Sequence, residues 1–248
     1  MSAHPSVHHQ TMRKEEQRVA IITGGSHGIG AGLVAAYRRR GWAVVANSRT
    51  IKLSEDPDLL AVDGDVSQMT TTDRIIGEAL ERFGRIDTLI NNAGVFMTKP
   101  FTDYTAEDYA FVVGVNLTGF FRLTQRAIAE MLKRSGGHVV NVTTTLVDYA
   151  NSNVPSALTS LTKGGIAAVT KSLAIEYASR GIRVNAVSPG IIQTSTEAPE
   201  TYDTLARLHP IGRVGQVSDV VDGILFLESS PFITGEVLHV DGGQIAGH

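Results

Sequence analysis

Short apolar, β-branched runs alternate with helix-length segments along nearly the whole chain, and this alternation constrains the fold more than any other feature. Several of the runs are apolar without interruption, which is typical of parallel strands covered by helices on both faces. The repeated order of strand, helix and strand predicts an α/β fold. We expect a Rossmann-type, doubly wound sheet of seven parallel strands flanked by helices on both faces. The seven runs are residues 18–25, 43–49, 59–66, 86–94, 138–145, 182–190 and 235–243.

The size of the chain suits one domain with a single well-filled core, because 42% of its 248 residues are hydrophobic. We expect that domain over residues 17–248, after a flexible polar tail over residues 1–16 that lacks a signal peptide's apolar segment. The net charge of −3 does not favour nucleic-acid binding, and no apolar run is long enough to span a membrane. The absence of cysteine excludes thiolate metal sites and cysteine nucleophiles. These properties favour a cytoplasmic protein that acts on a small molecule, with no metal site.

A glycine-rich turn, "TGGSHGIG", follows the first predicted strand and opens a helix. Gly24, Gly28 and Gly30 allow a tight turn and a close backbone approach to a pyrophosphate at the helix N-terminus. At the first strand–helix turn of an α/β chain this pattern strongly indicates a dinucleotide site. The alternative is a plain glycine turn. The intervening residues Ser26, His27 and Ile29 are predicted cofactor contacts.

The second predicted strand ends in "ANSR", where NAD sites of this type usually place an acidic residue on the ribose 2′-hydroxyl. Here Ser48 occupies that position and Arg49 follows it. A neutral residue and a guanidinium suit a 2′-phosphate, so we expect NADP(H) to be preferred over NAD(H). His27 is placed to approach the same phosphate. The alternative is that Arg49 is only a solvated loop charge.

Two connections between the predicted elements are unusual. Residues 50–64 leave room for little more than one or two helical turns, and Pro57 interrupts them, so we expect a shortened crossover. Residues 194–212 form a long, loosely patterned connection at the carboxyl edge of the sheet, for which a substrate lid is favoured over a disordered loop.

Six motifs in order make the chain similar to the short-chain dehydrogenase/reductase family over residues 18–243. They are "TGGSHGIG", "GDV" with Asp65, "NNAG" at residues 91–94, "VNLTG" with Asn116, "SPGIIQT" at residues 188–194 and "ITGEVLHVDGG". The resemblance implies a nicotinamide cofactor and a homodimer or homotetramer. It adds the following residues to the predicted cofactor site: Asp65, Val66, Asn92, Ala93, Gly94, Lys163, Pro189, Gly190, Ile192 and Thr194.

The family transfers a hydride between a nicotinamide and a carbonyl or alcohol, using a serine, a tyrosine, a lysine and an asparagine. The resemblance places Asn116 and Lys163 at two of these positions. Thr144 falls at the serine position, although a shift of one residue would place Thr143 or Thr145 there. Thr159 replaces the tyrosine, one helical turn before Lys163.

The tyrosine position is the serious departure, because an aliphatic hydroxyl is a poor proton donor at neutral pH. A positioned general acid typically contributes on the order of 10²–10⁴ in rate. Tyr149, in the loop that follows the fifth predicted strand, is a candidate substitute. Tyr202, in the predicted lid, and Lys163 or a water bound to it are others.

Three hypotheses follow from the sequence. We favour an NADP(H)-dependent oxidoreductase with an atypical active site and a non-standard proton relay, in which Thr144 and Thr159 bond the substrate oxygen. A nucleotide-binding protein without redox activity, acting as a sensor or partner subunit, is the alternative. Elimination or isomerisation on the same scaffold comes third. Neither the substrate nor the direction of the reaction is indicated.

Overall fold

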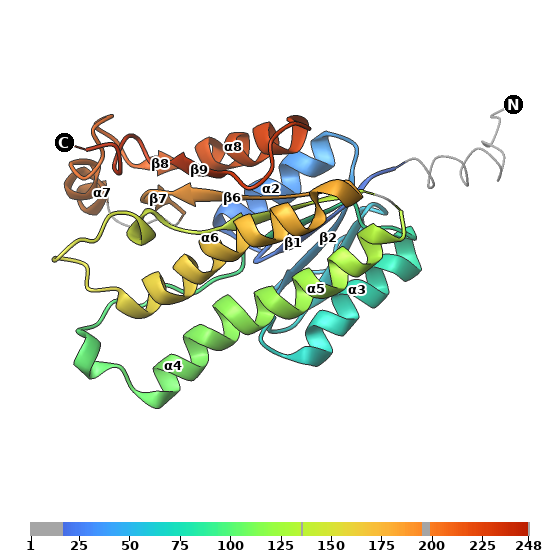
Figure 1. Ribbon diagram of the computed structural model, residues 1–248, viewed down its shortest axis with the longest axis horizontal. Helices are drawn as coiled ribbons and strands as arrows, with labels where there is room; N and C mark the ends of the chain where they lie inside the picture. Colours follow the sequence, from blue (N-terminus) through green and yellow to red (C-terminus); the bar gives the residue numbers. More distant parts are fainter. Residues whose placement is uncertain (1–16, 135, 195–198, 248) are drawn as a thin grey trace, which may run out of the picture.

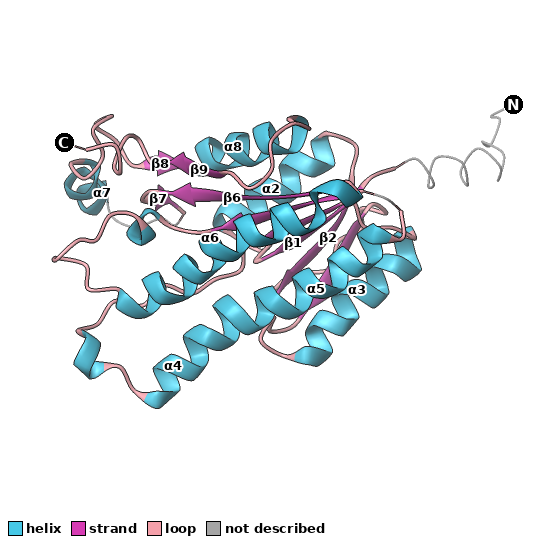
Figure 2. Ribbon diagram, in the orientation of Figure 1, coloured by secondary structure: helices cyan, strands magenta, loops and turns pink. Residues whose placement is uncertain are grey.

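The computed structural model describes residues 17–134, 136–194 and 199–247, so the predicted N-terminal tail lies outside the described residues. Seven parallel strands form one sheet in the order β3-β2-β1-β4-β5-β6-β9, which confirms the predicted fold (Figures 1 and 2). The strand order reverses between β1 and β4, and in such sheets ligands bind outside the carboxyl ends of the strands at that point. The strands are β1 (Val19–Thr23), β2 (Ala43–Ser48), β3 (Leu59–Asp63), β4 (Thr88–Asn91), β5 (Gly137–Val142), β6 (Ile182–Pro189) and β9 (Val237–Val240).

The helices form two layers, with α2 and α8 on one face of the sheet and α3, α5 and α6 on the other (Figure 1). Side chains of a strand alternate between its faces, so Val19 and Ile21 of β1 join one core while Ala20 and Ile22 join the other. The helices are α2 (Gly28–Arg39), α3 (Met69–Phe83), α4 (Ala106–Val113), α5 (Phe120–Leu132), α6 (Ala157–Tyr177), α7 (Pro199–Ala206) and α8 (Val217–Ser229). None of the helices in the described ranges combines the length and apolar character that a bilayer span requires.

Several short elements connect the main helices and strands. A π-helical turn, η2 (Gly114–Gly119), joins α4 to α5, and the 3-10 turn η3 (Thr145–Val147) follows β5. A separate parallel pair, β7 (Ile192–Gln193) and β8 (Gly215–Gln216), brackets the predicted lid, which contains α7. Two more 3-10 turns are η1 (Phe101–Asp103) and η4 (Ala178–Arg180).

The connection between β2 and β3 is shortened as predicted, because residues 49–58 contain no helix. Arg38 of α2 holds this segment through ion pairs to Asp56 at 2.8 Å and to Asp58 at 3.2 Å. These contacts keep the crossover against the sheet without a packed helix face.

A buried carboxylate joins the layer of α2 and α8 to the sheet at the amino ends of β4 and β5. Glu228, near the end of α8, accepts hydrogen bonds from Tyr37 of α2 at 3.0 Å and from Thr88 of β4 at 3.0 Å. The ring Nδ1 of His138 in β5 lies 3.1 Å from the same oxygen. Removing the carboxylate would leave all three buried partners without their acceptor.

We therefore expect Glu228→Ala to lower the free energy of unfolding by about 3 kcal/mol, the usual cost of breaking a buried charged network. Glu81→Ala, which alters an exposed acid on α3, is the matched control and should change it by less than about 0.5 kcal/mol. Urea denaturation measures both values. If Glu228→Ala and Glu81→Ala change the free energy of unfolding by equally small amounts, the Glu228 network contributes little to stability.

Candidate active site

The glycine-rich turn connects β1 to α2 and forms a cradle that only glycine permits. Gly24 has φ +69°, and a Cβ on Gly30 would lie 2.0 Å from the Gly24 carbonyl oxygen. His27 is the N-cap of α2 but its side chain makes no capping hydrogen bond. The helix N-terminus thus presents backbone N–H groups to the cradle, which fits the pyrophosphate of a dinucleotide.

The "NNAG" motif after β4 is bonded directly to this turn. The Thr23 hydroxyl accepts hydrogen bonds from the backbone N–H of Asn92 at 3.1 Å and of Ala93 at 2.9 Å. The Asn92 side chain donates to the Thr23 carbonyl at 2.9 Å. A Cβ on Gly94 would lie 2.8 Å from Lys163 Nζ, so glycine is needed there for the lysine to approach.

A cavity of about 100 Å³ at one end of the cradle brings together residues predicted to select the cofactor. Its lining includes His27, Ser48, Arg49, Asp65 and Val66. These residues come from three separate segments of the chain, and their arrangement fits the adenosine end of a nicotinamide dinucleotide.

Asn47 also lines this cavity and was not predicted from the sequence. Its side-chain nitrogen donates to the carbonyls of Val62 at 2.9 Å and Gly64 at 3.2 Å. Its buried Oδ1 has no donor among the described residues. A buried acceptor without a donor is costly, so a ligand that supplies a donor fits this end of the site.

A larger cavity, of about 590 Å³, lies at the other end of the cradle. It is bounded by β5, α6, the "SPG" turn after β6 and the segment around α7. The predicted residues that line it are Ile29, Asn92, Gly94, Thr144, Thr159, Lys163, Pro189, Gly190, Ile192 and Thr194.

Lys163 is the only ionisable residue among the described residues that line this larger cavity. It lies on α6, is 7% exposed, and donates through Nζ to the Val142 carbonyl at 2.8 Å. Burial lowers the pKa of its ammonium to about 8. An amine with that pKa can exchange protons near neutral pH, unlike an ordinary lysine.

Asn116 lies in the π-helical turn and connects three segments of the site. Its Oδ1 accepts from the Val95 N–H at 2.9 Å, and its Nδ2 donates to the Val95 carbonyl and to Thr162, each at 3.1 Å. A separate cavity of about 10 Å³ touches both Asn116 and Lys163. That volume accommodates one water molecule, as a relay toward the lysine would require.

The Thr159 hydroxyl forms hydrogen bonds with the backbone of Met97. It donates to the Met97 carbonyl at 3.3 Å and accepts from the Met97 N–H at 3.2 Å, joining α6 to the loop after β4. The side chain lines the cavity, yet its single hydroxyl hydrogen is used within the protein.

The hydrogen bonds of the three consecutive threonines after β5 distinguish their roles. Thr143 donates to the Val187 carbonyl at 3.1 Å and Thr145 donates to Gln244 at 2.9 Å. The Thr144 hydroxyl accepts from the Leu146 N–H at 3.4 Å, which uses an oxygen lone pair and leaves its hydrogen for another acceptor. Thr144 is therefore the threonine best suited to hold a substrate oxygen.

The predicted residues Ser26, Tyr149 and Tyr202 are among those outside the linings of both cavities. Tyr149 is half-buried after η3, and Tyr202 is buried on α7. The Ser26 hydroxyl lies 3.0 Å from the Nδ1 of His27. The structure does not bring either tyrosine to the cavity surface, and their roles as proton donors stay predictions.

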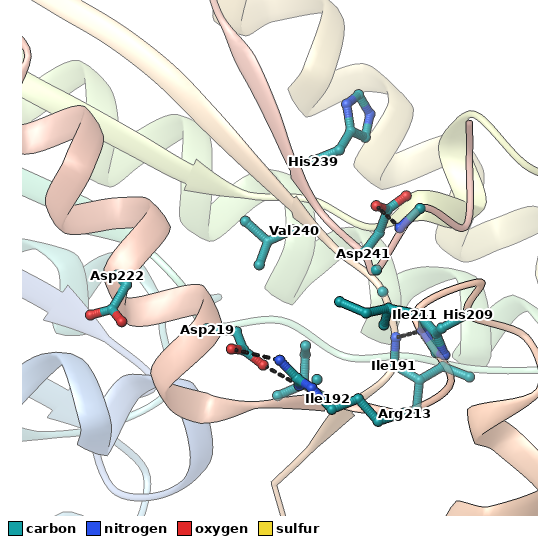
Figure 3. A pocket seen from close by; sticks show the side chains of 14 residues that line it. Ile191, Ile192, His209, Ile211, Arg213, Asp219, Asp222, His239, Val240 and Asp241 are labelled. Carbon is teal, nitrogen blue, oxygen red and sulfur yellow. Dashed lines mark hydrogen bonds and ion pairs between the residues drawn. The ribbon is translucent and has the colours of Figure 1, made fainter.

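A third cavity, of about 420 Å³, lies behind the "SPG" turn (Figure 3). Here His209 accepts a hydrogen bond from the Ile191 N–H at 3.0 Å, while its Nδ1 lies 3.3 Å from the Leu205 carbonyl. Burial lowers the pKa of His209, which favours the neutral ring that this pair of contacts requires. The histidine, not anticipated from sequence, thus ties the end of the predicted lid segment to the turn.

Comparisons with known proteins agree with this arrangement. A family model described as enoyl-(acyl carrier protein) reductase matches residues 24–244. A 3-oxoacyl-[acyl-carrier-protein] reductase from Synechocystis sp. is 34% identical over 241 residues, covering 92% of this chain and 97% of that protein.

Solved structures extend the similarity to the whole fold. ElxO with NADP bound has a TM-score of 0.86 and 30% identity, over 93% of this chain and 100% of that one. A 3-ketoacyl-(acyl-carrier-protein) reductase from Brucella melitensis complexed with NADH has a TM-score of 0.83 and 31% identity, over 92% and 98% of the two chains.

The burial of Lys163 leads to a stability prediction. Its pKa is lowered from 10.5 to about 8, so Lys163→Met should raise the free energy of unfolding of the cofactor-free protein by up to about 3 kcal/mol at pH 7. Between about pH 8 and pH 10.5, Lys163 is protonated in the unfolded chain but has lost its proton in the folded protein. The free energy of unfolding of wild type therefore rises with pH across that window. The difference in free energy of unfolding between Lys163→Met and wild type should therefore disappear above about pH 10.5.

Denaturant titrations at pH 7 and pH 10.5 measure this difference. Lys171→Met, on an exposed position of the same helix, is the control and should show no such pH dependence. A Lys163→Met protein that is less stable than wild type at pH 7 would contradict the prediction.

Proposed function

Because this chain belongs to the short-chain dehydrogenase/reductase family, we propose that it transfers a hydride between NADP(H) and a small carbonyl or alcohol substrate, with a non-standard proton relay. Members of this family are nicotinamide-dependent oxidoreductases. The relatives of this chain include a named 3-oxoacyl-[acyl-carrier-protein] reductase. The observation that carries the finer proposal is the position of Lys163, an amine of lowered pKa on the wall of the large cavity.

The cofactor site supports NADP(H) through its shape and its charges. The turn that contains Gly24 and Gly30 would hold the pyrophosphate, while His27, Ser48 and Arg49 would surround the 2′-phosphate. When bound, the nicotinamide supplies or accepts the hydride. One solved relative holds NADP and another holds NADH, so the preference rests on Arg49 and His27 of this chain.

Lys163 is placed to move the proton that normally passes through the family's tyrosine. In reduction, its ammonium gives a proton to the substrate oxygen, directly or through one water, and the neutral amine is then reprotonated from the side of Asn116. Burial makes the ammonium a stronger acid than in water, which favours this step. Thr144 holds the same oxygen through its hydroxyl hydrogen.

The alternative, a nucleotide-binding protein without redox activity, draws support from Thr159. Its hydroxyl bonds the Met97 backbone in both directions, which makes position 159 part of the framework. In that case the cofactor site would bind and signal without turnover.

Carbonyl reduction with NADPH tests the proposal. Lys163→Met should lower kcat/KM by on the order of 10²–10⁴, the contribution of a general acid, whereas Lys171→Met should change it little. In wild type, kcat/KM should be constant below about pH 8 and fall about tenfold per pH unit above it, since the ammonium is the reactive form.

Other outcomes separate the alternatives. Loss of turnover in Tyr149→Phe, with Lys163→Met still active, would assign the proton to Tyr149. Tight NADPH binding with no reduction of any carbonyl would favour the nucleotide-binding protein.

Cofactor preference has its own test. Arg49→Ala removes a guanidinium that would bond the 2′-phosphate, so the Kd for NADPH should rise about 10- to 100-fold while the Kd for NADH changes less than about threefold. Isothermal titration calorimetry measures both constants, with Arg40→Ala as an exposed control. Equal changes for NADPH and NADH would contradict the preference.

A further inference from the structure

We infer that the substrate is an uncharged, largely apolar compound that carries a second polar acceptor, and that the side-chain amide of Gln244 binds this acceptor. The inference rests on the proposed function, because it names the substrate class of the same cavity. It is carried by the composition of the cavity wall and by the contacts of Gln244.

The wall of the large cavity is mainly aliphatic and aromatic away from the lysine. Its apolar side chains come from separate segments: the loop after β4, η3, the loop before α6, the turn after β6, α7 and the chain that follows α7. They include Phe96, Leu146, Val154, Ile191, Leu205 and Leu208. These residues favour apolar substrate groups, because burying such groups removes them from water.

Among the described residues, the cavity lining offers no counterion for an anionic substrate apart from Lys163, which the proposed reaction uses. No arginine or histidine is among its described lining residues. A carboxylate or phosphate entering this cavity would lose water without gaining a second cationic partner, and that desolvation is costly. The wall therefore discriminates against acids.

Gln244 brings a polar group to this wall from the segment that follows β9. Its side chain is 4% exposed, and its Oε1 accepts the Thr145 hydroxyl at 2.9 Å. That contact orients the amide, and no acceptor for its nitrogen is found among the described residues. The two N–H donors are thus left for a molecule in the cavity.

The backbone around Gln244 is held in place by Asp241. The carboxylate of Asp241 accepts the N–H groups of Gly243 at 3.0 Å and Ile245 at 2.9 Å, on either side of the glutamine. Gln244 N–H donates to the Asp241 carbonyl at 3.2 Å. A donor fixed in this way loses little entropy when it binds a ligand.

Thr145, which bonds Gln244, directly follows Thr144 as the first residue of η3. The Gln244 amide therefore lines the same cavity as the hydroxyl that holds the reacting oxygen. One neutral molecule can then be bound at two points, its reacting oxygen by Thr144 and a second acceptor by Gln244, with an apolar framework between them.

Three ring ketones of similar size test the inference. They are 4-methoxycyclohexanone, its isostere 4-ethylcyclohexanone, which lacks the second acceptor, and the anion 4-oxocyclohexanecarboxylate. Binding is measured by saturation-transfer NMR with and without NADP⁺, and reduction by NADPH oxidation. Wild type should favour the methoxy compound over the ethyl compound by about tenfold, the effect of one hydrogen bond, and should bind the acid most weakly.

Gln244→Leu should abolish the preference for the methoxy compound, so that the ratio of kcat/KM for the methoxy compound to kcat/KM for the ethyl compound falls from about ten to about one. Gln244→Glu keeps an acceptor for Thr145 and removes the amide donors, so it should lose the preference too, even if the leucine variant folds poorly. Gln68→Leu, an exposed glutamine at the start of α3, is the control.

The failure of this inference differs from failure of the proposed function. A preference for the acid, or a methoxy preference that survives both Gln244 variants, would overturn the substrate class while leaving reduction intact. Binding of the methoxy compound that depends on Gln244, without NADPH oxidation, would support the cavity assignment and refute the proposed reaction.

Discussion

The whole site depends on the Thr23 hydroxyl, which joins the ends of β1 and β4 where the strand order reverses. It accepts hydrogen bonds from two backbone N–H groups of the "NNAG" segment and donates one to the Ile90 carbonyl at 3.4 Å. This one group fixes the glycine cradle relative to Gly94, and Gly94 in turn leaves room for Lys163. The cofactor cradle and the buried lysine are therefore held in one rigid arrangement at the carboxyl edge of the sheet.

The Thr159 hydroxyl joins α6 to the loop after β4. It donates to the Met97 carbonyl and accepts from the Met97 N–H, so its short side chain belongs to the framework of the site. One helical turn further along α6, Lys163 is buried on the wall of the large cavity. Desolvation by that burial lowers the pKa of its ammonium to about 8.

Much of the fold and of the cofactor site could be predicted from the sequence, because each depends on local patterns. Apolar runs marked the strands, and the glycine turn lay where it was expected. The sequence favoured Thr144 among the three threonines after β5 but left Thr143 and Thr145 open, since their roles depend on partners at Val187, Leu146 and Gln244. Asn47, His209 and Gln244 were missed for the same reason. Their contacts join segments far apart in the chain, and no spacing rule reports such contacts.

The helix-free crossover between β2 and β3 has a consequence for dynamics. Where a helix would cover the edge of the sheet, residues 49–58 are held by Arg38 to Asp56 and Asp58. Both acids are partly exposed, so salt weakens these pairs. We consequently expect the backbone amides of the edge strand β3 to exchange with solvent through a smaller local opening than those of the central strands.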